Sequence, residues 1–202
     1  MNGFNNTARK CYLTEFLLIL ILIFSLESLS KADDISEFEI EGMSIGDSLL
    51  DYYNLNEIKE QTNEKIYAGT NKKFSPLNIY GAKSELYVGL QIHYKTDDNK
   101  FIIYSIDGIF AYDEDPNNCK KKRSQILDDI SDNFSNLEKS EQKNVEMASE
   151  RGYMDRAQFF FKNGDFIDVV CYMYNDDASG YTDHGRIGVV SKELETWIVS
   201  IK

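Results

Sequence analysis

The sequence is poor in proline, histidine and cysteine, and most of its charged residues are acidic. Only two of the 202 residues are proline, whereas 42% are hydrophobic and 13% aromatic. This composition excludes a collagen-like, low-complexity or wholly disordered chain, because there is enough apolar side chain to build a core. Lysine and arginine number 22 against 34 aspartate and glutamate residues, so the net charge is −12. A general nucleic-acid binder would need the opposite excess to neutralise phosphates.

Several motifs that bind cofactors or metals are absent as well. The sequence contains no phosphate-binding glycine loop, no His-Glu-x-x-His and no Cys-x-x-Cys. Two histidines and three cysteines leave little material for a histidine-rich metal site. A nucleophilic pair would have to join Cys171 to His184, but a cysteine that we expect to be oxidised cannot supply a thiolate. We therefore predict no catalytic residue, no cofactor-binding residue and no cofactor.

The first 32 residues have the pattern of a secretory signal peptide. Its basic start, apolar middle and small-residue end are formed by Arg9, Lys10, residues 16–24, Ser30 and Ala32. Glu15 and Glu27 bracket only 11 residues, whereas a helix that spans a bilayer needs about 20. We expect cleavage after Ala32, which leaves residues 33–202 as a single exported domain, periplasmic or secreted. The alternative is an uncleaved N-terminal segment that anchors the protein to the membrane.

Two cysteines remain after this cleavage, because Cys11 lies in the leader. An even number of cysteines in an oxidising compartment predicts a disulfide, here between Cys119 and Cys171. Two periodic patterns support the pairing. Cys119 lies in line with the apolar stripe of an expected helix, and Cys171 falls on the more aliphatic face of an expected strand. The alternative is a pair of buried free thiols.

The mature sequence predicts an α+β fold with an antiparallel sheet of two hairpins plus a further strand, covered by one long helix. Alternating apolar residues predict the first hairpin at residues 86–96 and 100–112. His93 falls on its other face, where we expect it to be solvated. Asn163-Gly164 predicts a two-residue type I′ turn for the second hairpin. Residues 186–190 predict the further strand, and residues 63–84 are weakly patterned.

The long helix is expected to begin at Pro116, with Asp115 as its N-cap. Its apolar stripe has helical spacing and comprises Cys119, Ile126, Leu127, Ile130, Phe134 and Leu137. Short terminal helices are expected at both ends of the domain, with Asn56 capping one and Ser191 the other. The polar residues 138–149 are predicted to extend the long helix or to act as a connector.

The two-residue turn would fix the register of the second hairpin, with Phe161 opposite Phe166. One face would then carry the aliphatic residues, and the other would carry Phe159, Phe161, Phe166, Tyr172 and Tyr174. If the long helix covers the aliphatic face, the aromatic face needs its own cover. Residues 33–83 could fold over it as a second core layer. It could instead be a groove for a partner or an apolar ligand.

Residues 175–186 partly match a calcium-binding loop. The candidate ligands at alternating positions are Asn175, Asp177, Ser179 and Asp183, with Gly180 at the sharp turn. Arg186, however, occupies the last position, where a bidentate glutamate is required. The alternative is a polar turn between two strands.

Lys120-Lys121-Lys122-Arg123 is a run of four basic residues in an acidic chain. It could meet an anionic lipid head group, a glycan or an acidic partner. It also follows Asp113-Glu114-Asp115, which can neutralise part of it, so a solvated helix face is the alternative.

Residues 40–50, Ile-Glu-Gly-Met-Ser-Ile-Gly-Asp-Ser-Leu-Leu, resemble the opening of a group of small, uncharacterised exported bacterial proteins. In that group a Gly-Met-Ser turn near the mature N-terminus leads into a short helix, a hairpin, a cysteine-bearing helix and more strands. The same turn resembles the start of the SmpA/OmlA family of envelope assembly lipoproteins. This chain departs from that family because it lacks a lipidation cysteine at the expected cleavage site.

These patterns predict an exported cell-envelope protein that acts as a non-catalytic binding or assembly module. Its partner would be a protein or small ligand of the envelope rather than a nucleic acid. A stable membrane anchor would exist only if the N-terminal segment stays uncleaved. A carboxylate-dependent envelope hydrolase is the alternative, and it would need a cleft in which acids or His184 converge. A small calcium-stabilised domain is a third hypothesis.

Overall fold

The computed structural model describes residues 34–81, 86–112, 115–134, 136–147, 151–175 and 182–201. All of them lie within one compact unit, Ala32–Lys202. The predicted signal peptide lies outside the described residues. No helix in these ranges is long and apolar enough to cross a membrane.

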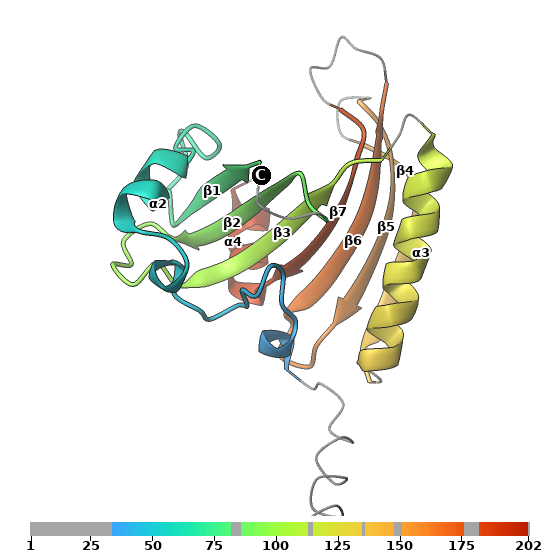
Figure 1. Cartoon of the computed structure of the whole chain (residues 1–202), viewed down its shortest axis with the longest axis horizontal. Coiled ribbons are helices and arrows are strands. Elements are labelled where there is room, and N and C mark those ends of the chain that lie inside the picture. The colour runs from blue at the N-terminus through green and yellow to red at the C-terminus, as the bar shows by residue number, and fades with distance from the viewer. Residues whose placement is uncertain are drawn as a thin grey trace, which may run out of the picture. The chain divides into compact units, whose positions relative to one another are not determined.

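The domain is built on a seven-stranded antiparallel sheet with the order β1-β2-β3-β7-β6-β5-β4 (Figure 1). The strands are β1 (Phe74–Tyr80), β2 (Gly89–Lys95), β3 (Ile103–Phe110), β4 (Glu138–Glu146), β5 (Gly152–Phe160), β6 (Phe166–Tyr174) and β7 (His184–Val190). The α+β class and the antiparallel sheet are confirmed. The sheet is larger than two hairpins and one strand, because β1 and β4 extend it at its two edges.

The two edge strands lie where no strand was predicted. β1 lies inside the weakly patterned residues 63–84, and β4 lies inside the polar residues 138–149. β4 is exposed at almost every position, so its sequence lacks the alternation that marks a half-buried strand. The prediction of a helix extension or connector for this segment was wrong for that reason.

Helix α3 (Pro116–Asn133) begins as expected, with the Asp115 carboxylate accepting a hydrogen bond from the Asn117 backbone N–H at 2.9 Å. It packs against β6 and β7, and Figure 1 shows it beside the β4–β6 half of the sheet. It does not cover the whole face. The N-terminal segment packs on the same main core, beside the β1–β3 half, through Ile35, Ile40, Met43, Leu49 and Ile58.

The shorter helices differ from expectation only in detail. The N-terminal segment contains two 3-10 turns, Ile35–Glu37 and Leu49–Asp51, and helix α2 (Leu55–Gln61). The cap of α2 is Asn54 rather than Asn56, and it forms a reciprocal capping box with Glu57. Helix α4 (Lys192–Ser200) has the predicted cap, because the Ser191 hydroxyl accepts from the Leu194 backbone N–H at 3.3 Å.

α4 packs on the sheet face opposite α3. Neighbouring residues of a strand point to opposite faces, and β7 shows this directly. Val189 belongs to the main core, whereas Val190 packs with Phe74, Leu194 and Trp197 in a smaller cluster. The sheet therefore has one face covered by α3 and the N-terminal segment, and a second face covered in part by α4 and by Tyr67 of the loop before β1.

The β5–β6 turn has a different register from the prediction. Phe160 pairs with Phe166 and Phe159 with Ile167. The connection runs from Phe161 to Asp165, because the Phe161 N–H donates to the Asp165 carbonyl at 2.9 Å. A type I′ turn needs positive φ at both central residues, but of Asn163 and Gly164 only Gly164 has it, at 90°.

This one-residue shift divides the five predicted aromatic residues between two faces. Phe159 and Phe161 lie in the main core with the N-terminal segment. Phe166, Tyr172 and Tyr174 point to the opposite face. The prediction of one aromatic face was therefore wrong. The N-terminal segment covers the α3 side of the sheet instead, whereas Tyr67 and Phe74 pack on the α4 side.

Cys119 of α3 and Cys171 of β6 form a disulfide, with their Cα atoms 6.0 Å apart. Both residues are fully buried and pack with Phe110. The bond joins the helix stripe to the aliphatic sheet face, as the two periodic patterns predicted. It is compatible with an exported protein.

Candidate functional site

Polar side chains lie side by side across the sheet face opposite α3. Directly opposite residues of antiparallel strands share a face, and the register aligns Asn78, Gln91, Asp107, Gly188, Asp168 and Gln158. We call these six residues the polar row. It crosses from β1 to β5, so the middle of the sheet face on which α4 packs is polar.

Two arginines from the adjacent cross-strand row neutralise the two aspartates. Arg186 Nη2 donates to Asp107 Oδ2 at 2.6 Å and to Gln91 Oε1 at 2.8 Å. Arg156 binds Asp168 through two hydrogen bonds, of 2.8 and 2.9 Å. Paired bonds of this kind fix the guanidinium plane as well as its position. The side chains of the polar row from Asn78 to Asp168 are therefore held by hydrogen bonds, whereas Gln158 at its end is not.

Burial and charge act against each other in this network. Burial raises the pKa of Asp168, although the charge and hydrogen bonds of Arg156 oppose the shift. Burial also favours loss of the Arg186 proton, but the Asp107 carboxylate outweighs it and raises the pKa of Arg186. The arginine stays charged, and the ion pairs persist across the physiological pH range.

Gly188 gives the Asp107 carboxylate its place in the row. A Cβ atom on Gly188 would lie 1.9 Å from Asp107 Oδ1 and 2.8 Å from Asp107 Cγ, so any side chain here would force the carboxylate to move. The Asp107 side chain therefore lies across the β7 backbone, between β3 and β6. Glycine at this position leaves the space that the Asp107 carboxylate occupies.

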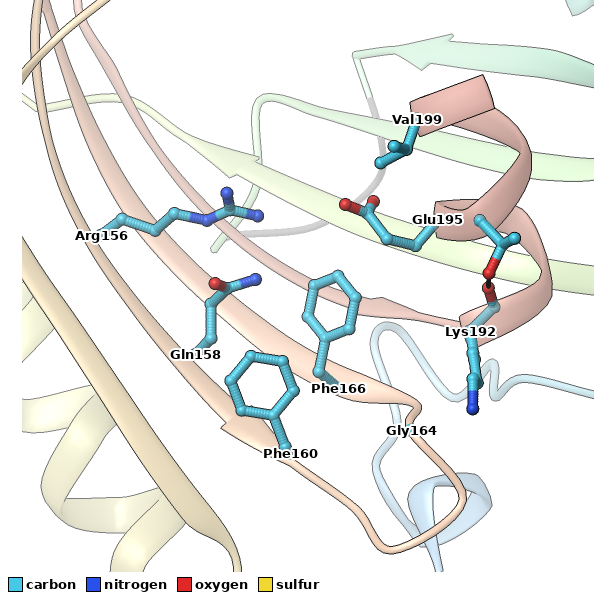
Figure 2. Close-up of a pocket in the computed structure, with 9 residues that line it drawn as sticks. Arg156, Gln158, Phe160, Gly164, Phe166, Lys192, Glu195 and Val199 are labelled. Atoms are coloured by element: carbon cyan, nitrogen blue, oxygen red, sulfur yellow. Dashed lines mark hydrogen bonds between the residues drawn. The ribbon is translucent and has the colours of Figure 1, made fainter. Parts of the chain in front are cut away.

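A groove lies where the end of the polar row meets α4. It encloses about 480 Å³, and Figure 2 shows its lining. The lining residues are Arg156, Gln158, Phe160, Gly164, Phe166, Lys192, Glu195, Thr196 and Val199. We call this feature the α4 groove. The half-buried ring of Phe160 forms its floor, and the buried ring of Phe166 lies against it with the centroids 5.6 Å apart.

Some polar side chains of the α4 groove have no hydrogen-bonding partner among the other described side chains. Within the described part of the chain, Gln158 and Glu195 are half-buried and their side chains have no hydrogen bond or ion pair. Arg156 uses Nε and Nη2 on Asp168, which leaves Nη1 for another acceptor. Figure 2 shows Arg156 and Gln158 reaching from β5 toward Glu195 on α4. The groove thus offers free donors and acceptors above an aromatic floor.

A neighbouring depression on the other side of α4 is roomier, at about 670 Å³, but its polar groups are already engaged. Glu193 pairs with Lys73 and Lys95. Asp165 accepts a hydrogen bond from the Lys192 backbone N–H at 2.8 Å, and Trp197 donates to Asn71. We therefore take the α4 groove as the candidate site.

His93 is buried rather than solvated, contrary to the sequence-based expectation. Its Nδ1 lies 2.8 Å from Ser105 Oγ and its Nε2 lies 3.0 Å from the Tyr67 hydroxyl. Burial, with a contribution from the charge of Arg186, lowers the pKa of His93 to about 3. Ser105 is 1% exposed and His93 is 5% exposed, so no substrate can reach this pair. It is a neutral structural contact between β2, β3 and the loop before β1.

Three stacked rings lie on the same face beyond Arg186. Tyr172 and His184 have centroids 4.9 Å apart, and Tyr174 stacks on both. His184 Nδ1 donates to the Thr182 carbonyl at 2.8 Å, and burial lowers the pKa of this histidine. Tyr172 and Tyr174 of the predicted partner face are therefore in contact with each other, several residues along β6 from Phe166.

Of the four calcium-loop candidates, only Asn175 and Asp183 lie within the described residues. Asp177 and Ser179 lie outside them. The Asp183 carboxylate accepts a hydrogen bond from the Tyr174 backbone N–H at 2.7 Å, which ties the ends of β6 and β7. Arg186 points into the polar row. No group of three or more metal-ligating side chains is found in the part of the chain that the structure describes.

The basic run is largely taken up by contacts within the domain. Lys120 pairs with Asp155 at 3.6 Å, Lys122 lies 4.6 Å from the centre of the Phe110 ring, and Arg123 is buried and donates to Glu141. Lys121 is the exposed member. The run is therefore neither a free basic patch nor a simple solvated helix face.

One catalytic pattern in the sequence has no catalytic geometry. Residues 42–46, Gly-Met-Ser-Ile-Gly, have the spacing of a nucleophile elbow, which sequence analysis did not single out. Ser44 is 6% exposed, and its hydroxyl donates to the Phe38 carbonyl at 3.3 Å. No histidine of the described residues hydrogen-bonds to it. The segment is a turn of the N-terminal cover.

Comparisons with protein-family models, curated proteins and solved structures found no match for this chain. The site is therefore interpreted from its own geometry. The polar residues that line the groove, above all Arg156, Gln158 and Glu195, were not among the predicted site residues. Of those, only Phe166 lines the α4 groove.

Proposed function

We propose that this protein is an exported, non-catalytic binding module of the cell envelope, with the α4 groove as its ligand site. The observation that carries the proposal is the pair of unpaired, half-buried side chains, Gln158 and Glu195, above the rings of Phe160 and Phe166. Ligand sites combine an apolar surface with a few well-placed polar groups that lack partners in the free protein.

The rigidity of the surroundings supports binding. Arg156 is held by Asp168. Arg186 donates to Gln91 Oε1, and Gln91 Nε2 in turn donates to Asn78 Oδ1 at 3.0 Å. A surface whose polar groups are already ordered loses little conformational entropy when a ligand arrives. β5 and β6 are also interior strands of the sheet, so the floor of the groove cannot move without breaking strand pairs.

The same network argues against a carboxylate-dependent hydrolase. Asp107 and Asp168 approach each other across Gly188, but each is bound by an arginine. A general acid or nucleophile needs a carboxyl group that is free to exchange a proton or to attack. Asp107 and Asp168 instead act as fixed partners of Arg186 and Arg156.

Export is supported by two independent features. Residues 1–32 have the order of basic, apolar and small residues that is typical of a signal peptide. The disulfide between Cys119 and Cys171 belongs to a domain that matures where thiols oxidise. We place the mature chain in the periplasm or outside the cell.

A titration followed by ¹⁵N-¹H NMR tests the binding function. The oxidised protein is titrated separately with three probes: chitotriose, the tripeptide Ala-Ala-Ala and octanoate. We expect at least one probe to cause saturable shifts in the amides of residues 156–166 and 192–199. If all three leave these residues unchanged at millimolar concentration, the α4 groove is not a ligand site and the proposal fails.

A further inference from the structure

We propose that the α4 groove binds a neutral glycan, with one sugar ring on Phe160 and its hydroxyls on Gln158, Glu195 and Arg156. This inference rests on the proposed binding function and names the ligand class. It follows from the charge, the polar groups, the floor and the surrounding backbone of the groove.

The charges in and around the groove balance. Arg156 is neutralised by Asp168 through two hydrogen bonds. Glu195 and Lys192 lie on the same helix and both line the groove. A polyanion or polycation would meet an equal number of unfavourable charges here. A neutral ligand has no such penalty.

The free polar groups match neighbouring hydroxyls. The Gln158 amide both donates and accepts, the Glu195 carboxylate accepts, and Arg156 Nη1 donates. Adjacent hydroxyls of a sugar also donate and accept, at a spacing that planar amide, carboxylate and guanidinium groups can bridge. An acyl chain would leave these groups desolvated without partners, which disfavours a lipid.

The floor suits the apolar side of a sugar ring. Phe160 is half-buried and offers an accessible ring surface, whereas Phe166 is buried beside it with its ring plane at 44° and supports the Phe160 ring from below. A pyranose carries its hydroxyls around its edge and C–H groups on its face. Such a face can be buried on aromatic rings while the edge reaches the polar side chains.

The backbone around the groove distinguishes a glycan from a peptide. β5 is paired on both sides, with β4 and β6, and β6 is paired with β5 and β7. Their main-chain groups are therefore used within the sheet, and those of α4 within the helix. A peptide ligand gains much of its affinity from free main-chain partners, whereas a sugar needs only the side chains.

The polar surface beyond the groove gives space for further sugar units. Ser140 of β4 pairs with Gln158, and Gln142 pairs with Arg156, so both share the face of the groove. Both are exposed. A linear chain that starts on the Phe160 ring can continue over these polar residues to the edge of the sheet. We therefore expect an oligosaccharide to bind more tightly than its monosaccharide.

Calorimetric and NMR titrations test the inference. The oxidised protein is titrated with chitotriose, cellotriose and mannotriose, and with the corresponding monosaccharides. At least one trisaccharide should bind with a dissociation constant below about 1 mM, at least fivefold more tightly than its monosaccharide. Its chemical-shift changes should centre on Phe160, Phe166 and Glu195.

Substitutions in the groove test whether the sugar binds there. Gln158→Ala, Phe160→Ala and the isosteric Glu195→Gln should each weaken the trisaccharide about tenfold, the effect of losing one well-formed contact. Gln125→Ala on α3 and Glu60→Gln on α2 are matched exposed controls and should bind as the unchanged protein does. Circular dichroism checks that each variant folds.

The outcomes separate the two proposals. If no sugar binds but Ala-Ala-Ala or octanoate shifts the groove residues, the glycan inference is overturned and the binding function stands. If none of the probes binds there, both proposals fail. If a sugar binds but Gln158→Ala and Glu195→Gln keep full affinity, the sugar lies elsewhere and the inference is overturned.

Discussion

At the residue scale, Gly188 decides whether the polar row can exist. The Asp107 carboxylate occupies the space that a Cβ on Gly188 would fill, and from there it binds Arg186. Both charged groups are largely buried, with side-chain exposures of 25% for Arg186 and 7% for Asp107. Displacing one partner would leave the other charge uncompensated, which is costlier than losing a surface ion pair.

Gly188→Ala should therefore lower the free energy of unfolding by about 2–4 kcal/mol. Urea unfolding followed by the fluorescence of Trp197, the single tryptophan, measures this. The same substitution in an Asp107→Ala background should cost much less, because the carboxylate that it displaces is gone. Equal costs in the two backgrounds would show that the contact with Asp107 is unimportant.

His93 makes the stability depend on pH. The folded protein keeps His93 neutral down to about pH 3, whereas the unfolded chain takes up the proton near about pH 6.5. Between these values the unfolded state binds more protons. The stability is therefore fully present above about pH 6.5 and declines as the pH falls, by at most about 1.4 kcal/mol per pH unit.

His93→Gln should flatten this decline. Urea unfolding of the unchanged protein and the variant is compared at pH 7, 6, 5 and 4. The slope of the free energy of unfolding against pH should be smaller in the variant by the contribution of about one proton. His184→Gln serves as the matched control. The pKa of His184 is lowered as well, but His184 is less buried than His93. Its replacement should therefore reduce the slope of the free energy of unfolding against pH by a smaller amount. An identical slope in the His93 variant would mean that this histidine is not held neutral.

The charged residues of the polar row left a weak signal in the sequence. Asp107 and Asp168 each interrupt an apolar strand, at residues 103–110 and 166–174. A charged residue inside such a strand predicts a buried partner, since an unpaired charge would be expensive there. Nothing in the local sequence says which arginine is the partner.

At the element scale, the disulfide is the connection between α3 and the sheet. It links residues 52 positions apart, and closing a loop of this length should contribute about 4 kcal/mol by restricting the unfolded chain. Local patterns were sufficient to predict it, because a helix stripe and a strand alternation each orient one cysteine without reference to the rest of the fold.

The double variant Cys119→Ala and Cys171→Ala should lose most of that stability. Urea unfolding measures the loss, and addition of dithiothreitol provides the control. Reductant should shift the midpoint of the unchanged protein toward that of the variant and leave the variant itself unaffected. A variant with an unchanged midpoint would contradict the stabilising role.

The β5–β6 hairpin shows why elements can be located correctly while their faces are not. Both strands lie close to where the alternation predicted them, but the turn uses Phe161 to Asp165 instead of two residues. Because side chains alternate with period two, that single-residue difference moved Phe159 and Phe161 into the core. Turn geometry here depends on tertiary contacts, including the Asp165 carboxylate that accepts from the Lys192 backbone.

At the scale of the whole molecule, we expect the leader to be cleaved and the exported domain to carry the disulfide. Expression of the full chain in a bacterium should yield an exported protein that begins at Asp33, as measured by intact-mass spectrometry. Its two cysteines should resist alkylation until reductant is added. A variant with Leu18→Arg and Leu20→Arg breaks the apolar run and should remain unprocessed. A membrane-bound product that retains residues 1–32 would instead support the anchored alternative.

The sequence by itself determined the features that depend on short stretches of chain. These are the antiparallel α+β class, α3 and α4 with their caps, the β2–β3 hairpin and the pairing of Cys119 with Cys171. Periodicity and capping act over a few residues, so they are visible without the fold.

Only the tertiary structure decided the binding surface. The last strand, β7, inserts between β3 and β6, and this brings Arg186 to Gln91 and Asp107, which precede it by 95 and 79 residues. It also places α4 beside the β5–β6 hairpin, where the groove forms. Which strands pair depends on the burial of the whole sheet rather than on any local pattern, and so the chain had to be folded before these residues could be grouped.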